Sequence, residues 1–250
     1  MRVRDIKVCV MRIEGTNCEE EAYMAFKRLG ANAEKVHLKQ LLGKCPSELK
    51  RDLSSYQILM IPGGFSAGDY VRAGAIWAAR MKSGLSKELV KFVDSGKPVL
   101  GVCNGFQVLV ELGLLPAFEE TMASVPEAVL NTNDSSRFEC RPTYLRHDNA
   151  GKCVFTGGLR KGEVVMCPSA HAEGKFMLPL DKQKKLLERL IENDQIVFRY
   201  SSPEGKVKPG YPWNPNGSLD DIAGICNPQG NVFGLMPHPE RVFTRYTHPD

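Results

Sequence analysis

In the first half of the chain, segments with the apolar pattern of strands are followed by segments with the apolar pattern of helices, and this order repeats. Short apolar runs predict buried strands, and the segments between them carry apolar residues at helical spacing. The predicted strands are 6–10, 33–38, 56–65 and 98–103, and the predicted helices are 17–30, 47–53, 86–96 and 104–113. Strands that alternate with helices indicate a parallel sheet covered by helices on both faces.

The first predicted helix carries signals for both of its ends. Asn17 is placed to cap it, and Glu20 follows three residues later. Gly30 stands where a helix commonly stops. We therefore expect the helix to begin just after Asn17 and to end at Gly30.

The pattern changes after Pro116. Short segments predict antiparallel strands added to the sheet, and the Pro- and Gly-rich stretch 202–217 predicts an ordered loop. The added strands are 128–133, 137–148, 152–157, 163–178 and 195–201, with a helix at 182–193 and closing segments at 222–227 and 232–243. The whole chain, 1–250, is thus predicted to form a single α/β domain with a doubly wound, mainly parallel sheet and added antiparallel strands.

Composition and charge narrow the classes of function. The 250 residues carry a formal net charge of only +4, and the basic run 182–185 fits one solvated helix face, so nucleic acid is not indicated as a partner. No apolar stretch approaches the ~18 residues of a membrane span, and the N-terminal segment lacks the apolar core of a secretory signal. We therefore expect no membrane association and a cytoplasmic location.

The cysteines are scattered singly along the chain. They form no pair or Cys/His cluster at the short spacing of tetrahedral zinc sites, so the sequence predicts no metal site. Reduced, mostly buried thiols are the expected state. The eight are Cys9, Cys18, Cys45, Cys103, Cys140, Cys153, Cys167 and Cys226.

Cys103 differs from the others in its context. It lies between Gly101 and Gly105, and between a predicted strand and a predicted helix, as the nucleophile elbow requires. The glycines relieve crowding at the sharp turn, and the helix N-terminus favours a thiolate. The backbone N–H of Asn104 would then point at an oxyanion on the attacked carbonyl. The alternative is a buried core cysteine, which is the commoner state of a free thiol.

A thiolate nucleophile needs a base, and two histidines have a glutamate two residues later. The pairs are His171 with Glu173 and His238 with Glu240. Positions i and i+2 of an extended segment face the same side, and prolines on both sides of His238 enforce an extended chain there. Spacing alone does not choose between the two pairs.

A second glycine-rich turn, 62–69, ends another buried strand. Ligands of doubly wound sheets bind at the carboxyl ends of the strands, so this turn is placed to face Cys103 and to offer the Gly64 N–H as a second oxyanion donor. The alternatives are a phosphate-binding loop and a simple turn. The segment lacks the GxxxxGK(S/T) lysine and the GxGxxG spacing, which weakens a nucleotide-binding interpretation.

Five segments together resemble one known family. They are similar to the glutaminase subunits of phosphoribosylformylglycinamidine synthase, the PurQ family, which belongs to the class I glutamine amidotransferases. The resemblance runs through essentially the whole chain and implies the flavodoxin-like fold of that class. The segments are PGGFSAGDYVRAGAIWA, GVCNGFQ, NDSSRFECR, SAHAEGKF and GLMPHPER.

The resemblance implies a catalytic triad of Cys103, His238 and Glu240, and it thereby decides between the two histidine pairs. Cys103 would attack the side-chain amide of L-glutamine, and a thioester and ammonia would result. Water would then release glutamate. Gly64 and Asn104 would supply the oxyanion hole.

Other matched positions would contact the substrate or a partner. Gln107 is similar to the family's glutamine-contacting residue, and Arg137 and Arg141 look like groups that bind substrate or face the synthetase. His171 and Glu173 match the family's AHGEG stretch, so their role stays open.

Two positions depart from the family's pattern. Ala172 replaces the usual glycine between His171 and Glu173, and Ala67 stands where many members have tyrosine. The second change is expected to alter packing beside the oxyanion turn.

The family's chemistry is completed on other chains. The resemblance implies a large PurL subunit that binds ATP, Mg²⁺ and formylglycinamide ribonucleotide, a small PurS subunit, and an internal tunnel for ammonia. This chain is expected to bind no cofactor itself and to hydrolyse glutamine slowly when isolated.

Three alternatives remain open at this point. A peptidase or gamma-glutamyl hydrolase shares the elbow and the histidine, and it would turn over its substrate without a partner. A non-catalytic subunit would leave the triad unused, so Cys103→Ser would not disturb the pathway. A glutaminase for another acceptor is opposed only by the family-specific segments.

Overall fold

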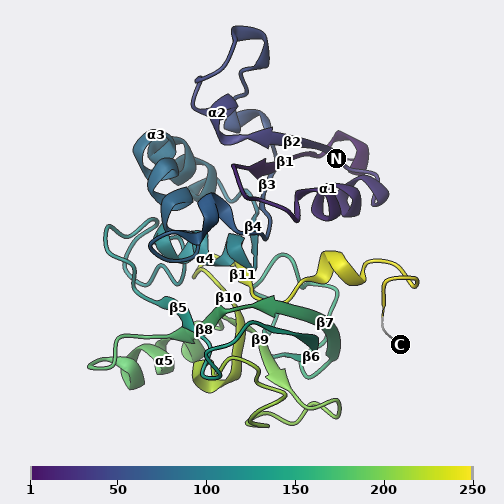
Figure 1. Ribbon diagram of the computed structural model, residues 1–250, viewed down its shortest axis with the longest axis vertical. Helices are drawn as coiled ribbons and strands as arrows, with labels where there is room; N and C mark the ends of the chain where they lie inside the picture. The colour runs from purple at the N-terminus through teal and green to yellow at the C-terminus, as the bar shows by residue number, and fades with distance from the viewer. Residues whose placement is uncertain (1, 249–250) are drawn as a thin grey trace.

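The computed structural model describes residues 2–248, and its helices and strands are shown in Figure 1. The strands are β1 (Lys7–Arg12), β2 (Asn32–His37), β3 (Ile58–Ile61), β4 (Val99–Val102), β5 (Val129–Thr132), β6 (Glu139–His147), β7 (Val164–His171), β8 (Glu173–Met177), β9 (Ile196–Ser201), β10 (Ile222–Cys226) and β11 (Val232–Leu235). The α-helices are α1 (Glu19–Arg28), α2 (Leu38–Leu41), α3 (Ala75–Asp94), α4 (Asn104–Glu111) and α5 (Gln183–Glu192).

A nine-stranded sheet with the order β2-β1-β3-β4-β11-β10-β9-β6-β7 runs through the molecule. Strands β2 to β11 in this order are mutually parallel. From β10 onward each strand is antiparallel to its neighbour. Strands β5 and β8 form a separate two-stranded sheet. The predicted α/β fold, a parallel sheet extended by antiparallel strands, is confirmed.

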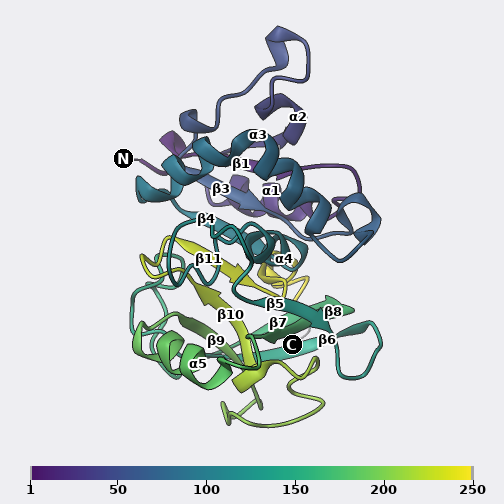
Figure 2. The ribbon, with the colours of Figure 1, turned by 90° about the vertical axis from the view of Figure 1, so that its left-hand side faces the viewer.

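Helices cover both faces of the parallel part of the sheet. Figures 1 and 2 show α3 on one face and α1 on the other, with the 3₁₀ turn η6 (Pro239–Val242) on the same side as α1. Helix α4 packs against β3, β4 and β11, and Phe106 and Leu109 on it are fully buried. Burial of each such side chain contributes roughly 1.5–3 kcal/mol. This packing fixes the N-terminus of α4, where Cys103 lies.

Several elements differ from the prediction in their bounds. Helix α3 begins at Ala75, eleven residues before the predicted start at 86, and it is the longest helix. In place of the single helix predicted over 47–53, one 3₁₀ turn covers Ser47–Leu49 and a second covers Leu53–Ser55. Neither α3 nor any other helix within residues 2–248 is long and apolar enough to cross a bilayer.

The predicted cap of α1 was wrong. The N-cap residue is Cys18, and no side chain caps the helix. The Cys18 N–H donates to the carbonyl of Gly63 at 3.2 Å, so a contact with the turn after β3 fixes the chain here in place of a side-chain cap. Gly30, with φ +87°, follows the end of the helix as expected.

In the second half, residues 152–157 form turns instead of the predicted strand. The Asn149 side chain accepts from the N–H groups of Gly151 and Cys153, and so holds this segment in a turn. The single strand predicted at 163–178 is two strands, β7 and β8, which break at Ala172 and enter different sheets. Residues 202–217 form an irregular loop, as predicted.

Candidate active site

The candidate site lies at the carboxyl edge of the parallel strands. Strand β1 sits between β2 and β3, so the strand order reverses there, and ligands of such sheets bind beside this reversal. The loops that follow β1, β3, β4 and β11 carry Cys18, Gly64, Cys103 and His238 respectively. Four segments that are far apart in sequence therefore meet at one edge of the sheet.

The backbone of Cys103 forms the sharp turn predicted for it. Its φ of 51° and ψ of −109° are unfavourable for a residue with a side chain, at a cost of about 1–3 kcal/mol. A Cβ on Gly105 would lie 1.8 Å from the carbonyl oxygen of Ile61, and one on Gly101 would lie 2.5 Å from the carbonyl oxygen of Gly105. Both positions therefore exclude any larger residue. The Sγ atom of Cys103 lies 3.6 Å from the carbonyl oxygen of Ala170.

His238 and Glu240 form a buried pair just after β11. The Nδ1 atom of His238 lies 2.6 Å from Oε1 of Glu240, and the two side chains are 1% and 5% exposed. The backbone N–H of His238 donates to the carbonyl of Pro168 at 2.8 Å. Glu240 lies in the 3₁₀ turn η6, so the turn that begins at Pro239 brings the carboxylate back to the ring. The extended chain predicted through Glu240 therefore ends at His238, because the 3₁₀ turn begins at the next residue.

The charges around His238 favour its protonated form. Burial is the largest single influence and opposes that form, but the combined attraction of Cys103, Cys18 and Glu240 outweighs it, so the pKa of His238 is raised. A Cβ on Gly63 would lie 2.8 Å from Cε1 of His238 and 3.3 Å from the Cβ of Cys103. Cysteine and histidine thus pack against the same glycine, where the absence of a side chain lets them lie close together.

A small cavity of about 50 Å³ opens beside Cys103. Gly64 and Gln107 are among the residues that line it. The Asn104 side chain joins the neighbouring turn to the helix: its Oδ1 accepts from the Ser66 N–H at 3.3 Å, and its Nδ2 donates to Oε1 of Gln107 at 2.9 Å. Because Asn104 is the first residue of α4, its backbone N–H has no partner within the helix.

His171 and Glu173 do not form a second pair. Nδ1 of His171 lies 3.2 Å from Oδ1 of Asn133, while Oε2 of Glu173 accepts from the backbone N–H of Ala73 at 3.0 Å. Burial, followed by the positive charge of His238, lowers the pKa of His171 to about 4. His171 is therefore a neutral imidazole at ordinary pH. Both residues nevertheless line the cavity beside Cys103.

The two arginines singled out from the sequence do not border this cavity. Arg137 is exposed. Arg141 donates to Glu139 and, at 2.8 Å, to the hydroxyl of Tyr211, and its guanidinium lies 4.8 Å from the centre of the Tyr211 ring. Phe138, which lies between the two arginines in sequence, does line the cavity.

The chain matches the family model for the CobB/CobQ-like glutamine amidotransferase domain over residues 5–250. It is 57% identical to the phosphoribosylformylglycinamidine synthase subunit PurQ of Archaeoglobus fulgidus, a match that covers 97% of this chain and 89% of that protein. The chain belongs to the PurQ family. The subunit of the same name from Picrophilus torridus is 49% identical, over 96% of this chain and 88% of that protein.

A solved structure shows that the similarity holds for the fold as well as for the sequence. The structure of PurLQS from Thermotoga maritima contains a chain that superposes with a TM-score of 0.74 at 32% sequence identity, over 97% of this chain and 92% of that one. The family expected from the five sequence segments is thus confirmed.

Three residues that had no role in the prediction from sequence lie at this PurQ-family site. Asp69 lines the cavity, and burial together with the charge of Glu173 raises its pKa to about 6. Nη2 of Arg241 donates to Sγ of Cys18 at 3.1 Å. Asp69 and Arg241 fall within the segments that carry the resemblance, and this was the only feature of the sequence that pointed to a role for them in the site. Cys18 had none, because only the fold brings it to His238.

Proposed function

We propose that this chain is the glutaminase subunit of phosphoribosylformylglycinamidine synthase. It hydrolyses L-glutamine to glutamate and ammonia and supplies the ammonia for purine biosynthesis. The observation that carries the proposal is the convergence of Cys103, on its strained turn, with the buried His238–Glu240 pair. This arrangement occurs in a chain that matches PurQ proteins along nearly its whole length.

The proposed reaction uses a covalent intermediate. The Cys103 thiolate attacks the side-chain carbonyl carbon of glutamine, and the N–H groups of Gly64 and Asn104 stabilise the oxyanion. His238 gives its proton to the leaving nitrogen, so the C–N bond breaks and ammonia departs from the thioester. Water then attacks the thioester and passes a proton to His238, and glutamate leaves as the Cys103 sulfur is freed. Glu240 holds Nδ1–H of the ring throughout, which leaves Nε2 for the reacting atoms.

Two carboxylates make the cavity suitable for binding a free amino acid. Asp69 and Glu173 both line it, and their negative charges favour the α-ammonium group of glutamine. Gln107 is held in place by Asn104 and by the carbonyl of Glu173.

The proposal includes partners that complete the reaction. A PurL subunit would bind ATP, Mg²⁺ and the ribonucleotide acceptor, and a PurS subunit would join the complex. This chain would supply ammonia and bind no cofactor of its own for that step. The structure of PurLQS supports the assignment of partners, because its matching chain is similar to this one over 97% of the length.

A glutamine-analogue electrophile, 6-diazo-5-oxo-norleucine, tests the proposal. With eight cysteines present, selectivity is the signal, and we expect mass spectrometry to find the adduct on Cys103 alone. Excess glutamine should suppress it, and Cys103→Ser should abolish it. The proposal is wrong if Cys103 stays unlabelled both in the isolated chain and with PurL and PurS, while a general alkylating agent modifies it.

A further inference from the structure

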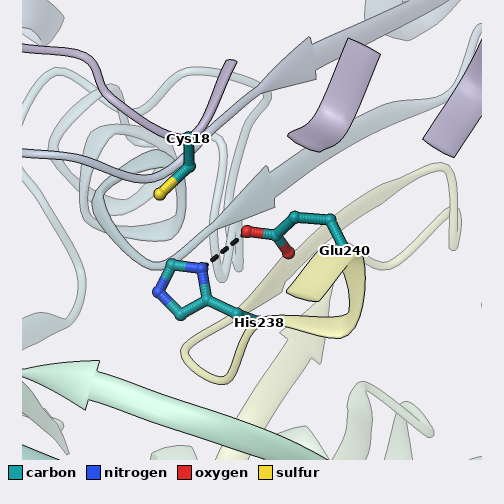
Figure 3. A group of neighbouring side chains, drawn as sticks. All are labelled: Cys18, His238 and Glu240. Carbon is teal, nitrogen blue, oxygen red and sulfur yellow. Dashed lines mark hydrogen bonds and ion pairs between the residues drawn. The ribbon is translucent and has the colours of Figure 1, made fainter. Parts of the chain in front are cut away.

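A second cysteine lies beside the His238–Glu240 pair. Figure 3 shows the Cys18 thiol and the Glu240 carboxylate approaching the His238 ring from different segments. One ligand atom from each of the three residues lies within 4.8 Å of the other two. Cys18 and His238 are each 1% exposed, and the Glu240 side chain is 5% exposed. Three potential metal ligands are thus enclosed together.

The donor atoms match the preferences of Zn²⁺, which takes thiolate, imidazole and carboxylate ligands. Zinc bonds of about 2.0–2.3 Å place tetrahedral ligands roughly 3.3–3.8 Å apart, so the three side chains need to shift by only about 1 Å. Nε2 of His238 and Oε2 of Glu240 are buried without a hydrogen-bond partner. Oε2 of Glu240 therefore has a lone pair available to a cation, and Nε2 of His238 gains one when the ring loses its proton.

We propose that Cys18, His238 and Glu240 form an inhibitory zinc site. On binding, the Cys18 thiol proton and one ring proton of protonated His238 leave to solvent. Sγ, the ring nitrogen freed in this way and one carboxylate oxygen then bond the metal, with water as the fourth ligand. The metal removes His238 and Glu240 from the triad, so Cys103 loses its base. Zinc binding stands independently of the enzymatic assignment, whereas the inhibition rests on the proposed function.

Arg241 competes with the metal for this site. Its guanidinium donates to Sγ of Cys18 at 3.1 Å, and it is also attracted by the charge of Glu240. A second cation beside it is disfavoured, so Arg241 must turn away when zinc binds. Removing this side chain should strengthen zinc binding, which is the opposite of the effect of removing a ligand.

The test measures metal binding to the full chain without reference to activity. Cys45 is half-buried and Cys140 is exposed, so a Cys45→Ser/Cys140→Ser background removes the accessible thiols outside the site. Co²⁺ reports a thiolate ligand through its near-ultraviolet charge-transfer band, and competition with a coloured chelator gives the zinc affinity. Circular dichroism checks that each variant is folded.

We expect Cys18→Ser to abolish the Co²⁺ band and to weaken zinc binding by at least about tenfold, since even outer-shell partners are worth 10–100-fold. Cys103→Ser should keep the band, and Arg241→Ala should tighten zinc binding. The inference is overturned if Cys103→Ser loses the band while Cys18→Ser keeps it, because the metal then sits on the proposed nucleophile. It is also overturned if Arg241→Ala weakens binding.

Inhibition is measured separately in the complex with PurL and PurS. Each variant is compared with its own zinc-free rate of glutamate release. Zinc should slow the parent enzyme and spare Cys18→Ser. If the Co²⁺ band depends on Cys18 but no preparation hydrolyses glutamine, the proposed function fails and the metal site stands. If zinc inhibits Cys18→Ser as strongly as the parent, the proposed site is not the inhibitory one.

Discussion

Among single residues, Glu240 has the most clearly defined role in the proposed reaction. Glu240→Gln keeps the shape of the side chain but removes the charge that stabilises the His238 imidazolium. We expect kcat for glutamine hydrolysis to fall by about 10²–10⁴-fold, with KM nearly unchanged, because Glu240 does not line the cavity beside Cys103. Steady-state glutamate release by the assembled complex measures both constants. Exposed Glu192 on α5 gives the matched control, Glu192→Gln. A raised KM with normal kcat would contradict the assignment.

His171 makes a prediction about stability. Its pKa of about 4 in the folded chain lies below the ordinary 6.5, so below pH 6.5 the unfolded chain binds a proton that the folded chain does not. The free energy of unfolding therefore falls as pH drops from 6.5 towards 4, by at most about 1.4 kcal/mol per pH unit from this group. Above pH 6.5 His171 adds no slope.

His171→Gln should flatten that acid-side slope. Urea unfolding of both proteins at pH 7, 6, 5 and 4.5 gives the comparison, and the two stability curves should converge towards low pH. Parallel curves would show that another group carries the loss.

The candidate residues could be found from sequence where the chemistry is local. Cys103 with its two glycines lies within five residues, and His238 and Glu240 lie within three. The choice between the two histidine pairs could not be made from spacing. In the folded chain the Glu173 carboxylate accepts a hydrogen bond from the backbone N–H of Ala73, and the His171 ring pairs with Asn133 instead. That competition exists only in the folded chain.

At the scale of elements, the contact between α4 and β3 depends on Gly105. A Cβ there would lie 1.8 Å from the carbonyl oxygen of Ile61, so the helix must move away from the strand. We expect Gly105→Ala to destabilise the fold by about 3 kcal/mol. Gly157→Ala is the control, because a Cβ at Gly157 meets nothing within 4 Å and should change stability by no more than about 0.5 kcal/mol. Thermal or urea unfolding measures both changes in stability. If Gly105→Ala and Gly157→Ala destabilise the fold equally, the steric explanation for Gly105 is wrong.

The sequence predicted elements well where their own residues determine them. Strands β1, β3 and β4 are apolar runs and β2 is a mixed polar and apolar segment, and the positions of all four agree with the prediction to within a few residues. The errors lie where a specific hydrogen bond decides. The Cys18 N–H donates to the carbonyl of Gly63, which is distant in sequence, and so fixes the start of α1. The Asn149 side chain is close in sequence, and it accepts from the Cys153 N–H and holds the chain in a turn. The periodicity of apolar positions contains no information about either hydrogen bond.

For the molecule as a whole, the proposed function predicts activation by partners. Ammonia released without an acceptor would waste glutamine, so the isolated chain should hydrolyse it slowly. Adding PurL, PurS, ATP and Mg²⁺ should raise the rate of glutamate release by a factor of about 5–150, the usual range of coupling between sites. Cys103→Ser in the same mixture gives the background. A fast isolated chain that ignores the partners would favour a free-standing hydrolase.

Strand β11 has a consequence for how the enzyme is made. It joins β4 to β10, although β4 and β11 are more than 120 residues apart. While a ribosome is still producing the residues before 232, the parallel and antiparallel parts of the main sheet lack the strand that connects them. The nucleophile at 103 already exists in that nascent chain, but its base does not. Unfinished chains therefore cannot hydrolyse glutamine by the proposed reaction, because His238 follows β11, the strand that completes the main sheet.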